Sequence, residues 1–461
     1  MTSYSPHPAS FRDKSGSVFF SANEVFRTIN NFYKENYSIL KSSGLYSELI
    51  KKDLLIQHRE IKDYRNRFKS EGVYKIIKPR LIPFISYPFE WCHSQLMEAA
   101  LLTLEIEKIS LGYGMTLKDA TAYNVQFEGY KPVFIDTLSF EKNKEDSPWI
   151  PYRQFCQQFL VPLALSKYKD LHLGKLSRIY LDGIDLSLAV KLLPVSSFHN
   201  FHLLLHIFLH RLSQKHLKVT PFPVRGKKYS LDNKFNMIES LQSAVSSLTR
   251  KKQNSFWSGY YQDNNYSLAS FESKSGIIGK IARGLKPGLV ADLGANTGFY
   301  SRLVSSYSRY VISMDIDPQS VEESFQLTKK EKIKNIINII ADLTNPSPAI
   351  GWRNQERYSL LERLKVDSVL ALALSHHLFF SHNISFEFQA KFFASMAENL
   401  IIEFIPISDN QIRELIRFRS ESFADYTKDN FIKCFTRYFL IKKHFPIKDS
   451  IRSVFYLKRK S

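Results

Sequence analysis

The chain has 461 residues, which suits two or three domains, and 44% of them are hydrophobic, as in proteins that bury sizeable cores. Its formal net charge is +20, but the basic residues are scattered, so a solvated basic surface is favoured over a dedicated nucleic-acid or membrane patch. Three widely spaced cysteines argue against a disulfide framework or a zinc site, and no run approaches the roughly 18 apolar residues of a membrane span.

Residues 1–60 predict an N-terminal extension made of a hairpin and a helix. The segments 16–20 and 24–29 alternate around 21–23 as the two strands of a hairpin do, and a helical stretch follows. Residues 1–20 are polar and lack the apolar core of a signal peptide, which, together with the cysteine usage, predicts a cytoplasmic location. Nothing in this extension indicates chemistry.

A second, α+β domain is predicted over residues 61–217. A helix is expected over about 93–109, because apolar residues recur there on one face. After it come Asp119, then Asn124 five residues later, and then Asp136, which follows a predicted pair of strands.

This order of residues resembles the catalytic and metal-binding loops of protein-kinase-like and aminoglycoside-kinase-like folds. In those folds the first Asp is the base, and the Asn and the last Asp hold Mg²⁺. No glycine-rich phosphate loop precedes the motif, and no Lys–Glu pair can be assigned. We therefore expect a degenerate kinase-like domain in which Asp119, Asn124 and Asp136 pin a loop by hydrogen bonds. Phosphotransfer, or a substrate-binding role of this loop, is the alternative.

The residues after this motif are expected to be helical, and one helix carries a row of histidines. His202, His206 and His210 stand at i, i+4 and i+8, a spacing that can bind a metal ion. Acidic partners are missing nearby, and Leu and Phe fill the other positions. We therefore predict the polar face of a core helix and no metal site, with an interfacial membrane helix as a minor alternative.

Residues 218–265 predict a linker and a cap segment. The stretch is rich in Lys, Pro, Ser and Asn, contains one short predicted helix, and ends in a cluster of aromatic residues within 256–266. Those aromatic side chains either face a ligand or pack against the next domain, and the sequence leaves both options open. The C-terminal domain is predicted over 266–461.

The most informative stretch of the chain opens this C-terminal domain. A short apolar run ends at Asp292 and passes into a small-residue turn with Gly294, Asn296 and Gly298, after which a helical pattern begins. Glycines there allow positive φ and bring bare backbone close to a nucleotide-like ligand. Asp315 ends the second apolar run, at the separation of about 20 residues where nucleotide-binding folds place a ribose-binding acid.

Three further apolar runs follow, separated by helical patterns. The third ends at Asp342, the fourth is followed by His376 and His377, and the fifth covers 400–406. Two closing strands are expected over 439–445 and 453–458. This alternation predicts an α/β domain with a sheet whose strand ends carry polar side chains.

The strand-end acids and the glycine turn, in this order, resemble a class I S-adenosylmethionine-dependent methyltransferase. The resemblance implies a Rossmann-like, seven-stranded methyltransferase sheet with an antiparallel end, and S-adenosyl-L-methionine as cofactor. It also implies a role for each acid. Asp292, with the turn residues Gly294, Asn296 and Gly298, would hold the methionine part of the cofactor. Asp315 would hold the ribose, and Asp342 would contact the adenine. The turn departs from the family pattern at Asn296, which replaces the usual middle glycine. An NAD-type Rossmann domain or a nucleotide-free sheet is the alternative.

The two halves together resemble two-part bacterial methyltransferases, the NoeA-like nodulation methyltransferases. The resemblance covers nearly the whole chain and rests on four stretches: Thr116 to Asn124, Val133 to Asp136, Tyr152 to Phe155 and Ile402 to Pro406. It implies no certain substrate.

The expected function is therefore methyl transfer. A sulfonium methyl is electrophilic, so the protein mainly aligns a nucleophile, and His376 or His377 is the candidate base beside the transfer point; the alternative is that both only shape the pocket. A small-molecule, glycan or lipid-linked saccharide acceptor is favoured. RNA methylation through the basic surface and a non-catalytic scaffold are the other hypotheses. Peripheral membrane contact stays open, and the sequence predicts no oligomeric state.

Overall fold

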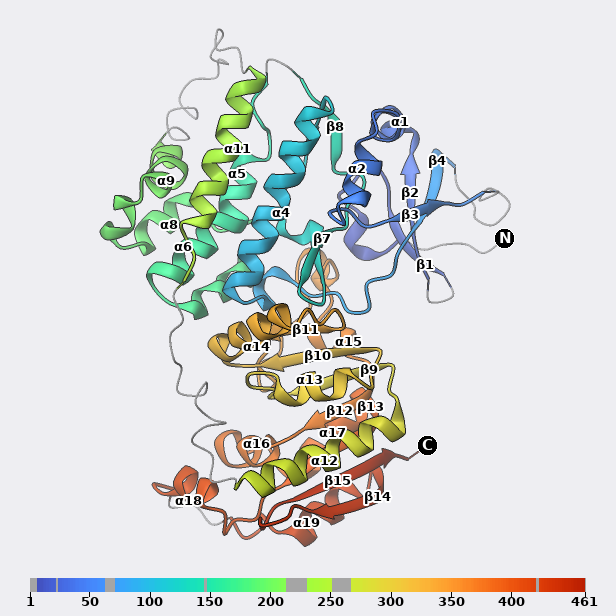
Figure 1. Ribbon diagram of the computed structural model, residues 1–461, viewed down its shortest axis with the longest axis vertical. Coiled ribbons are helices and arrows are strands. Elements are labelled where there is room, and N and C mark those ends of the chain that lie inside the picture. Colours follow the sequence, from blue (N-terminus) through green and yellow to red (C-terminus); the bar gives the residue numbers. More distant parts are fainter. Residues whose placement is uncertain are drawn as a thin grey trace. The chain divides into compact units, whose positions relative to one another are not determined.

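The computed structural model describes residues 6–21, 24–62, 71–144, 147–212, 230–250, 267–419 and 423–460. The chain divides into two compact units, which are described separately below (Figure 1). Unit 1 comprises Met1–Lys252 and Ala349–Tyr358, and unit 2 comprises Gln253–Pro348 and Ser359–Ser461.

Unit 1 contains an antiparallel sheet and a group of helices, with the long helix α4 between them in the view of Figure 1. The four strands in the order of the sheet are β1 (Val18–Ser21), β2 (Glu24–Asn30), β4 (Val73–Pro79) and β3 (His58–Glu60). The hairpin expected at the N-terminus is present, because β1 pairs with β2 from Val18 opposite Arg27 to Ser21 opposite Glu24. β2 also pairs with β4, so one sheet unites residues on both sides of the predicted boundary at residue 60.

The helical part of unit 1 is built on α4, which spans His93–Gly112 and confirms the helix expected there. Two short antiparallel pairs follow: β5 (Met115–Leu117) with β8 (Phe140–Lys142), and β6 (Val125–Glu128) with β7 (Lys131–Phe134). Besides α4, the α-helices in the described part of this unit are α1 (Lys34–Ser42), α2 (Leu45–Lys51), α5 (Tyr152–Phe155), α6 (Val161–Tyr168), α7 (Leu176–Ile179), α8 (Leu186–Leu192), α9 (Phe201–Leu203) and α11 (Leu231–Ser246).

The predicted linker is partly a helix that packs. α11 has 16 residues rather than the short helix expected; it buries Ile238, Leu241, Ala244 and Val245, and it contacts α4 and α9. Residues 218–229 and 251–265, together with the aromatic cluster within 256–266, lie outside the described residues.

The histidine row lies on two kinds of helix. His202 belongs to α9, whereas His206 lies in a π-helix over Leu204–Leu209, which changes the expected i, i+4 alignment. His206 is buried, with ring nitrogens 2.8 Å from the Tyr152 hydroxyl and 2.9 Å from the Ser240 hydroxyl. The row is thus the polar side of a packed helix. In the described part of the chain, no group of three His, Cys, Asp or Glu is arranged to hold a metal ion.

A segment of the predicted methyltransferase domain belongs to unit 1. In Ala349–Tyr358, the buried Glu356 carboxylate accepts hydrogen bonds from the Arg12 guanidinium at 2.5 and 3.1 Å. The backbone N–H of Tyr358 donates to the Tyr87 hydroxyl at 2.9 Å. These partners are hundreds of residues away in sequence, so local patterning could not reveal them.

Unit 2 is a three-layer α/β domain, and its Rossmann-like character confirms the fold class expected for the C-terminal part. Within the described residues its sheet has seven strands, in the order β11 (Ile336–Ile340), β10 (Tyr310–Asp315), β9 (Leu289–Leu293), β12 (Val366–Ala371), β13 (Ala397–Phe404), β15 (Ser453–Arg459) and β14 (Phe439–Pro446). The first five strands in this order are parallel, and β15 and β14 are antiparallel to their neighbours. The strand core is almost fully buried, as expected of parallel strands covered on both faces.

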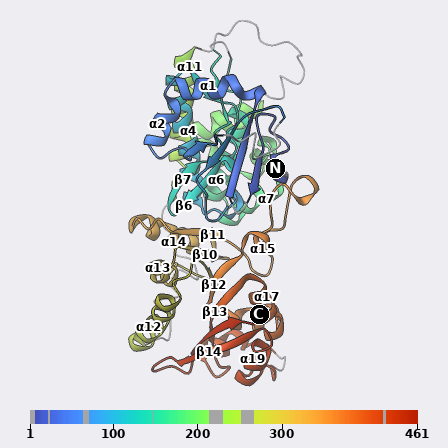
Figure 2. The ribbon, with the colours of Figure 1, turned by 90° about the vertical axis from the view of Figure 1, so that its right-hand side faces the viewer.

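Helices cover both faces of this sheet (Figure 2). One face carries α12 (Leu268–Leu285), α13 (Phe299–Ser305) and α14 (Pro318–Lys330), and the opposite face carries α17 (Phe386–Met396) and α19 (Lys428–Phe435). The other α-helices that the structure describes in this unit are α15 (Leu360–Arg363), α16 (Ser375–His382) and α18 (Asn410–Ile416). Local signals set two of the helix starts: Asp317 caps α14 ahead of Pro318, and Thr427 caps α19.

Strand order fixes where a ligand can bind in unit 2. The chain runs outward from β9 through β10 to β11, and then returns to the other side of β9 with β12 and β13. In such sheets the crevice lies at the carboxyl ends of the strands where the order reverses. Among the described helices, none combines the length and apolarity that crossing a membrane requires.

Candidate functional site

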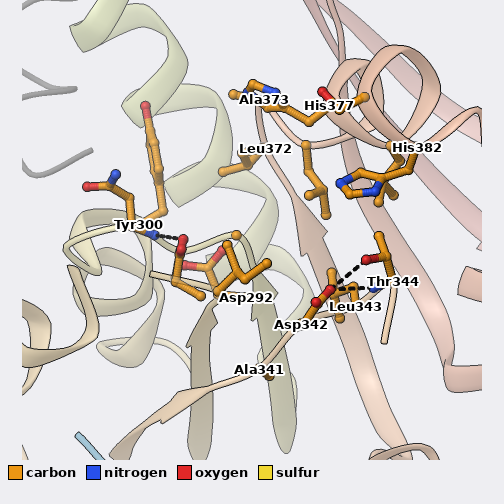
Figure 3. Close-up of a pocket in the computed structure, with 18 of the residues that line it drawn as sticks. Asp292, Tyr300, Ala341, Asp342, Leu343, Thr344, Leu372, Ala373, His377 and His382 are labelled. Atoms are coloured by element: carbon orange, nitrogen blue, oxygen red, sulfur yellow. Dashed lines mark hydrogen bonds between the residues drawn. The ribbon is translucent and has the colours of Figure 1, made fainter. Parts of the chain in front are cut away.

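A cavity of about 380 Å³ lies at the carboxyl ends of the parallel strands of unit 2 (Figure 3). Its walls come from the loops after β9, β10, β11 and β12 and from helices α12, α13 and α16. The lining residues are Phe271, Lys274, Asp292, Gly294, Ala295, Asn296, Tyr300, Asp315, Ile316, Ala341, Asp342, Leu343, Thr344, Leu372, Ala373, Leu374, His377, Leu378, Ser381 and His382. The volume falls in the range of small-molecule sites.

The turn after β9 supplies backbone to this cavity. Gly294 and Asn296 line it with φ of 71° and 51°, in the left-handed region. The N–H groups of Gly294 and Ala295 donate to the carbonyl of Met314 at 3.0 and 2.9 Å, which ties the turn to β10. Gly298 is not among the lining residues; it precedes α13, and a Cβ there would stand 2.2 Å from the Ser324 hydroxyl. Close packing against Ser324 therefore explains why the residue at position 298 is a glycine.

Asp315 connects the turn with the end of β10. Its Oδ2 accepts from the N–H of Asn296 at 2.7 Å, and its Oδ1 accepts from the N–H of Asp317 at 3.0 Å. Burial raises the pKa of Asp315, while these backbone hydrogen bonds oppose the rise. The carboxylate is thus held in one orientation at the cavity wall.

Asp292 is the most buried acid of the cavity. Its side chain accepts from the Ser301 hydroxyl at 2.6 Å, and only 2% of the residue is exposed. Burial raises the pKa of Asp292 to about 6, and the charge of Asp315 adds to the rise. A carboxylate in such a place favours a positively charged partner.

Asp342 lies on a different wall from Asp292, in the loop after β11. Its Oδ1 accepts from the backbone N–H and the hydroxyl of Thr344, at 2.9 and 2.7 Å (dashed lines in Figure 3). The acids at the ends of three neighbouring strands therefore line one cavity, as their sequence positions predict.

The two candidate base residues differ in position. His377 lines the cavity with Ser381 and His382 from the next turn of α16, whereas His376 is buried and is not among the lining residues. Burial lowers the pKa of His377 to about 4, helped by the charge of His382, so its imidazole is neutral at physiological pH. His377 can therefore accept a hydrogen bond from a ligand in the cavity.

The sequence patterns did not identify two charged residues of the site, Lys274 on α12 and Glu403 on β13. Lys274 lines the cavity and forms a buried ion pair with Glu403, with 2.7 Å between Nζ and Oε2. Glu403 lies inside the fifth apolar run, one residue before the end of β13, so it lacks the strand-end position that identified Asp292 and Asp315. A Lys on a helix before the first strand gives no such signal.

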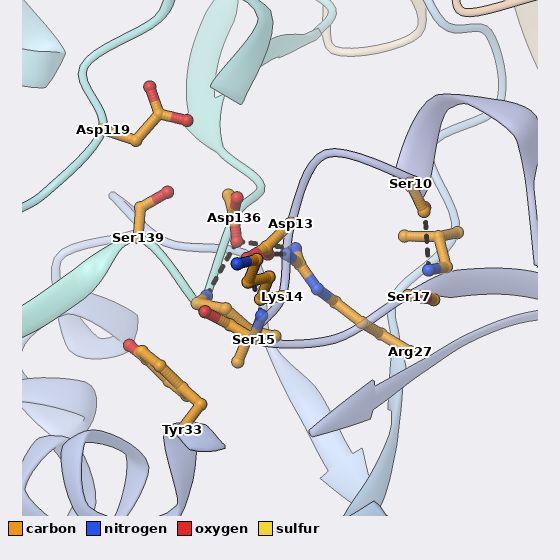
Figure 4. A network of polar contacts seen from close by, with 12 residues as sticks. Ser10, Asp13, Lys14, Ser15, Ser17, Arg27, Tyr33, Asp119, Asp136 and Ser139 are labelled. Carbon is orange, nitrogen blue, oxygen red and sulfur yellow. Dashed lines mark hydrogen bonds and ion pairs between the residues drawn. The ribbon is translucent and has the colours of Figure 1, made fainter. Parts of the chain in front are cut away.

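The kinase-like motif lies in unit 1, and Figure 4 shows the contacts of its last acid, Asp136. The guanidinium of Arg27, from β2, lies 2.6 Å from Asp136 and 2.9 Å from Asp13. Asp136 also accepts from the N–H of Leu138 at 2.7 Å. A fixed positive charge therefore already faces Asp136.

The first part of the motif is held by amides. Asp119 accepts from the side-chain amide of Gln154 at 2.8 Å and from the N–H of Thr121 at 3.1 Å. The Asn124 amide donates to the Ser139 hydroxyl at 3.0 Å. Burial raises the pKa of Asp119, and the charge of Asp136 adds to the rise. The kinase-like character of this region stays a prediction.

No protein-family model matches the chain. Among curated proteins, nodulation protein NoeA of Rhizobium meliloti (strain 1021) is 30% identical over 458 residues, which cover 98% of this chain and 95% of that protein. The chain belongs to the family of nodulation protein NoeA. The family resemblance predicted from the two halves of the sequence is confirmed, and membership in the NoeA family extends over both units.

Solved methyltransferase structures resemble part of this NoeA-family chain at low scores. N-methyltransferase NodS from Bradyrhizobium japonicum WM9, in complex with S-adenosyl-l-homocysteine, is 10% identical with a TM-score of 0.33, over 47% of this chain and 98% of that chain. The magnesium protoporphyrin IX methyltransferase ChlM from Synechocystis PCC 6803, with bound SAH, is 17% identical with a TM-score of 0.32, over 44% and 93%. Matches at this level do not identify a ligand of this chain.

Proposed function

We propose that unit 2 binds S-adenosylmethionine in the cavity and directs its methyl group to an acceptor. The observation that carries the proposal is the convergence of Asp292, Asp315 and Asp342, from the ends of three neighbouring parallel strands, on one cavity beside a turn of bare backbone. A ligand that combines an amino acid, a ribose and a base fits such a set of groups.

Each acid has a role in this proposal. Asp315, an acceptor held by two backbone N–H groups, receives hydrogen bonds from the ribose hydroxyls. Asp342 faces the adenine, and the turn with Asp292, Gly294 and Asn296 surrounds the methionine part. Gly298 supports that turn from outside the cavity.

S-adenosylmethionine, when bound, supplies an electrophilic methyl group on a sulfonium. The protein then has to hold the acceptor atom in line with the bond that breaks, exclude water, and receive or relay the acceptor's proton. We assign the last task to His377, because its unprotonated imidazole lines the cavity; with a pKa of about 4 it relays the acceptor's proton rather than retaining it. Its neighbour Ser381, one helical turn further along α16, lines the same wall.

We favour a small molecule, a glycan or a lipid-linked saccharide as acceptor over RNA. Among the described residues that line the cavity, Lys274 is the one Lys or Arg, and its charge is balanced by the ion pair with Glu403. The excess positive charge of the chain therefore lies elsewhere than on the described walls of the cavity. RNA binding relies on many Lys and Arg side chains near the phosphates.

Methyl incorporation tests this function. Purified protein is incubated with S-adenosylmethionine labelled in the methyl group and with fractionated cell extract, and label is expected in a small-molecule, glycan or lipid fraction. His377→Gln is expected to lower incorporation roughly 100-fold, within the range of general-base effects, while S-adenosylhomocysteine still stabilises the variant against heat. Label in the RNA fraction would overturn the proposed acceptor class, and absence of label from every fraction would contradict methyl transfer.

We infer that the kinase-like motif of unit 1 serves structure rather than phosphotransfer. Arg27 holds Asp136 and Asp13 together, and these side chains are 13%, 16% and 32% exposed. Arg27→Met leaves two largely buried carboxylates without this partner, so we expect the unfolding free energy to fall by about 2–3 kcal/mol, less than a fully buried pair would lose.

Urea unfolding of the full chain measures this loss. Arg80→Met is the matched control, because Arg80 pairs with Glu128 at the surface, where its side chain is 55% exposed, and a change below about 1 kcal/mol is expected. Equal losses of unfolding free energy in Arg27→Met and Arg80→Met would contradict the structural role of Arg27. Stabilisation by ATP with Mg²⁺ that disappears in Asp136→Ala would instead support phosphotransfer.

A further inference from the structure

A buried ion pair forms part of the cavity wall. The Lys274 and Glu403 side chains are 5% and 0% exposed, and their charged atoms lie 2.7 Å apart. Withdrawing two charges from water is costly, so a buried pair is weak evidence for stability. Glu403 balances the charge of Lys274, and because Lys274 also lines the cavity, its ammonium group can in addition contact an anionic group of a bound ligand.

Glu403 fixes this cation to the cavity. Its Oε2 accepts both from Lys274 Nζ and from the backbone N–H of Ala373 at 2.9 Å. Ala373 lines the cavity in a left-handed conformation, with φ of 49°. The Lys274 ammonium also lies 4.9 Å from the ring centre of Tyr300, another lining residue. Helix α12, the end of β13 and the loop after β12 thus hold one ammonium group in place.

The cavity brings this ammonium group near a carboxylate of opposite charge. Lys274 and Asp292 both line it. Burial lowers the pKa of Lys274 and raises the pKa of Asp292, and each group partly offsets the shift of the other through space, because the two charges are opposite. In Figure 3, Asp292 and Tyr300 lie on one side of the cavity, away from Asp342 and Thr344. One end of the cavity therefore offers a cation and an anion, which complement the two charges of a free α-amino acid group.

We propose that Lys274 binds the carboxylate at the amino-acid end of S-adenosylmethionine and that Glu403 is the residue that positions Lys274 for this contact. Asp292 faces the ammonium group of the same amino acid. The proposal rests on the proposed function, because it assigns one end of the ligand of that site. It makes an amino-acid carboxylate a requirement for tight binding.

Decarboxylated S-adenosylmethionine is the probe for this requirement, since it keeps the adenosine, the sulfonium and the ammonium group and lacks only the carboxylate. Titration calorimetry on the full chain compares it with S-adenosylmethionine. We expect the wild-type protein to prefer S-adenosylmethionine roughly 30-fold, as one charge-assisted hydrogen bond provides. Lys274→Met is expected to abolish this preference, while affinity for the decarboxylated compound changes less than about threefold on the same scale.

A second variant protects the test against misfolding. Lys274→Met leaves the Glu403 carboxylate buried without its cation, so Lys274→Met with Glu403→Gln removes both charges together. The double variant is also expected to bind the two compounds equally, and Glu403→Gln alone is expected to keep part of the preference.

The outcomes separate the two proposals. A wild-type protein that binds neither compound would overturn the proposed function and this inference with it. A wild-type protein that binds S-adenosylmethionine, with a double variant that keeps the full preference or weakens both compounds equally, would overturn the inference alone. Lys274 would then have a structural role only.

Discussion

Replacing Asp315 by alanine is expected to weaken the binding of S-adenosylmethionine roughly 100-fold or more, because hydrogen bonds from two ribose hydroxyls to a charged acceptor are lost together. The same change releases the N–H groups of Asn296 and Asp317, which the carboxylate accepts at 2.7 and 3.0 Å, so the turn after β9 also loses its anchor. Titration calorimetry with S-adenosylmethionine and with S-adenosylhomocysteine measures the loss.

Asp367→Ala is the matched control for this variant. Asp367 belongs to the same sheet but accepts from the N–H of Leu289, at the start of β9 and thus at the opposite edge. Its loss is expected to leave the affinity within about twofold of the wild-type value, since no ligand contact is removed. If Asp315→Ala binds as well as Asp367→Ala, the ribose is not bound at the end of β10, and the site assignment fails.

The acids of the cavity could be predicted from the sequence for a simple physical reason. Parallel strands present their carboxyl ends at one edge of the sheet, so acids that end successive apolar runs meet there. Asp292, Asp315 and Asp342 satisfy this rule, and the structure brings all three to one cavity. The periodic signals for β9 to β13 were strong because buried parallel strands are nearly continuous apolar runs.

Side-chain orientation within the helices could not be predicted in the same way. His376 and His377 are neighbours at the start of α16, and successive residues of a helix point about 100° apart, so one of them reaches the cavity while the other enters the core. The sequence pattern made both residues candidate bases. Which of the two faces the ligand depends on how α16 packs, and that is set by the whole unit.

Long-range pairing explains the remaining omissions. Lys274 meets Glu403 across 129 residues, and Arg12 meets Glu356 across 344 residues. Neither contact leaves a trace in local periodicity, because each partner alone reads as an ordinary surface charge. The assignment of residues 349–358 to unit 1 has the same origin. By contrast, the ties of Asp119 and Asn124 to nearby loops are short in sequence and match the hydrogen-bonded loop predicted for them.

Gly298 is a position of unit 2 where a single added methyl group is expected to lower the stability. Gly298→Ala places a Cβ 2.2 Å from the Ser324 hydroxyl at a φ of 72°, where residues other than glycine are strained by about 1 kcal/mol. Ser324 cannot move without cost, because its hydroxyl donates to the buried Asn338 side chain at 2.6 Å. With about 1–3 kcal/mol for overpacking added, we expect the unfolding free energy to fall by about 3 kcal/mol. Urea unfolding of the full chain measures it.

Gly279→Ala is the control that should change stability in the opposite direction. Gly279 lies inside α12, and the nearest heavy atom to a new Cβ is a Leu303 methyl at 4.0 Å, so the added methyl group has room. Alanine also loses less backbone entropy than glycine when a helix forms, so we expect a gain of about 0.5–1 kcal/mol. Two glycines of one unit then separate the two reasons for a glycine: Gly298 is required by close packing and backbone conformation, whereas Gly279 is replaceable. Equal stabilities of the two variants would show that the turn after β9 yields to the added methyl group, and the tight support proposed for the cofactor turn would have to be abandoned.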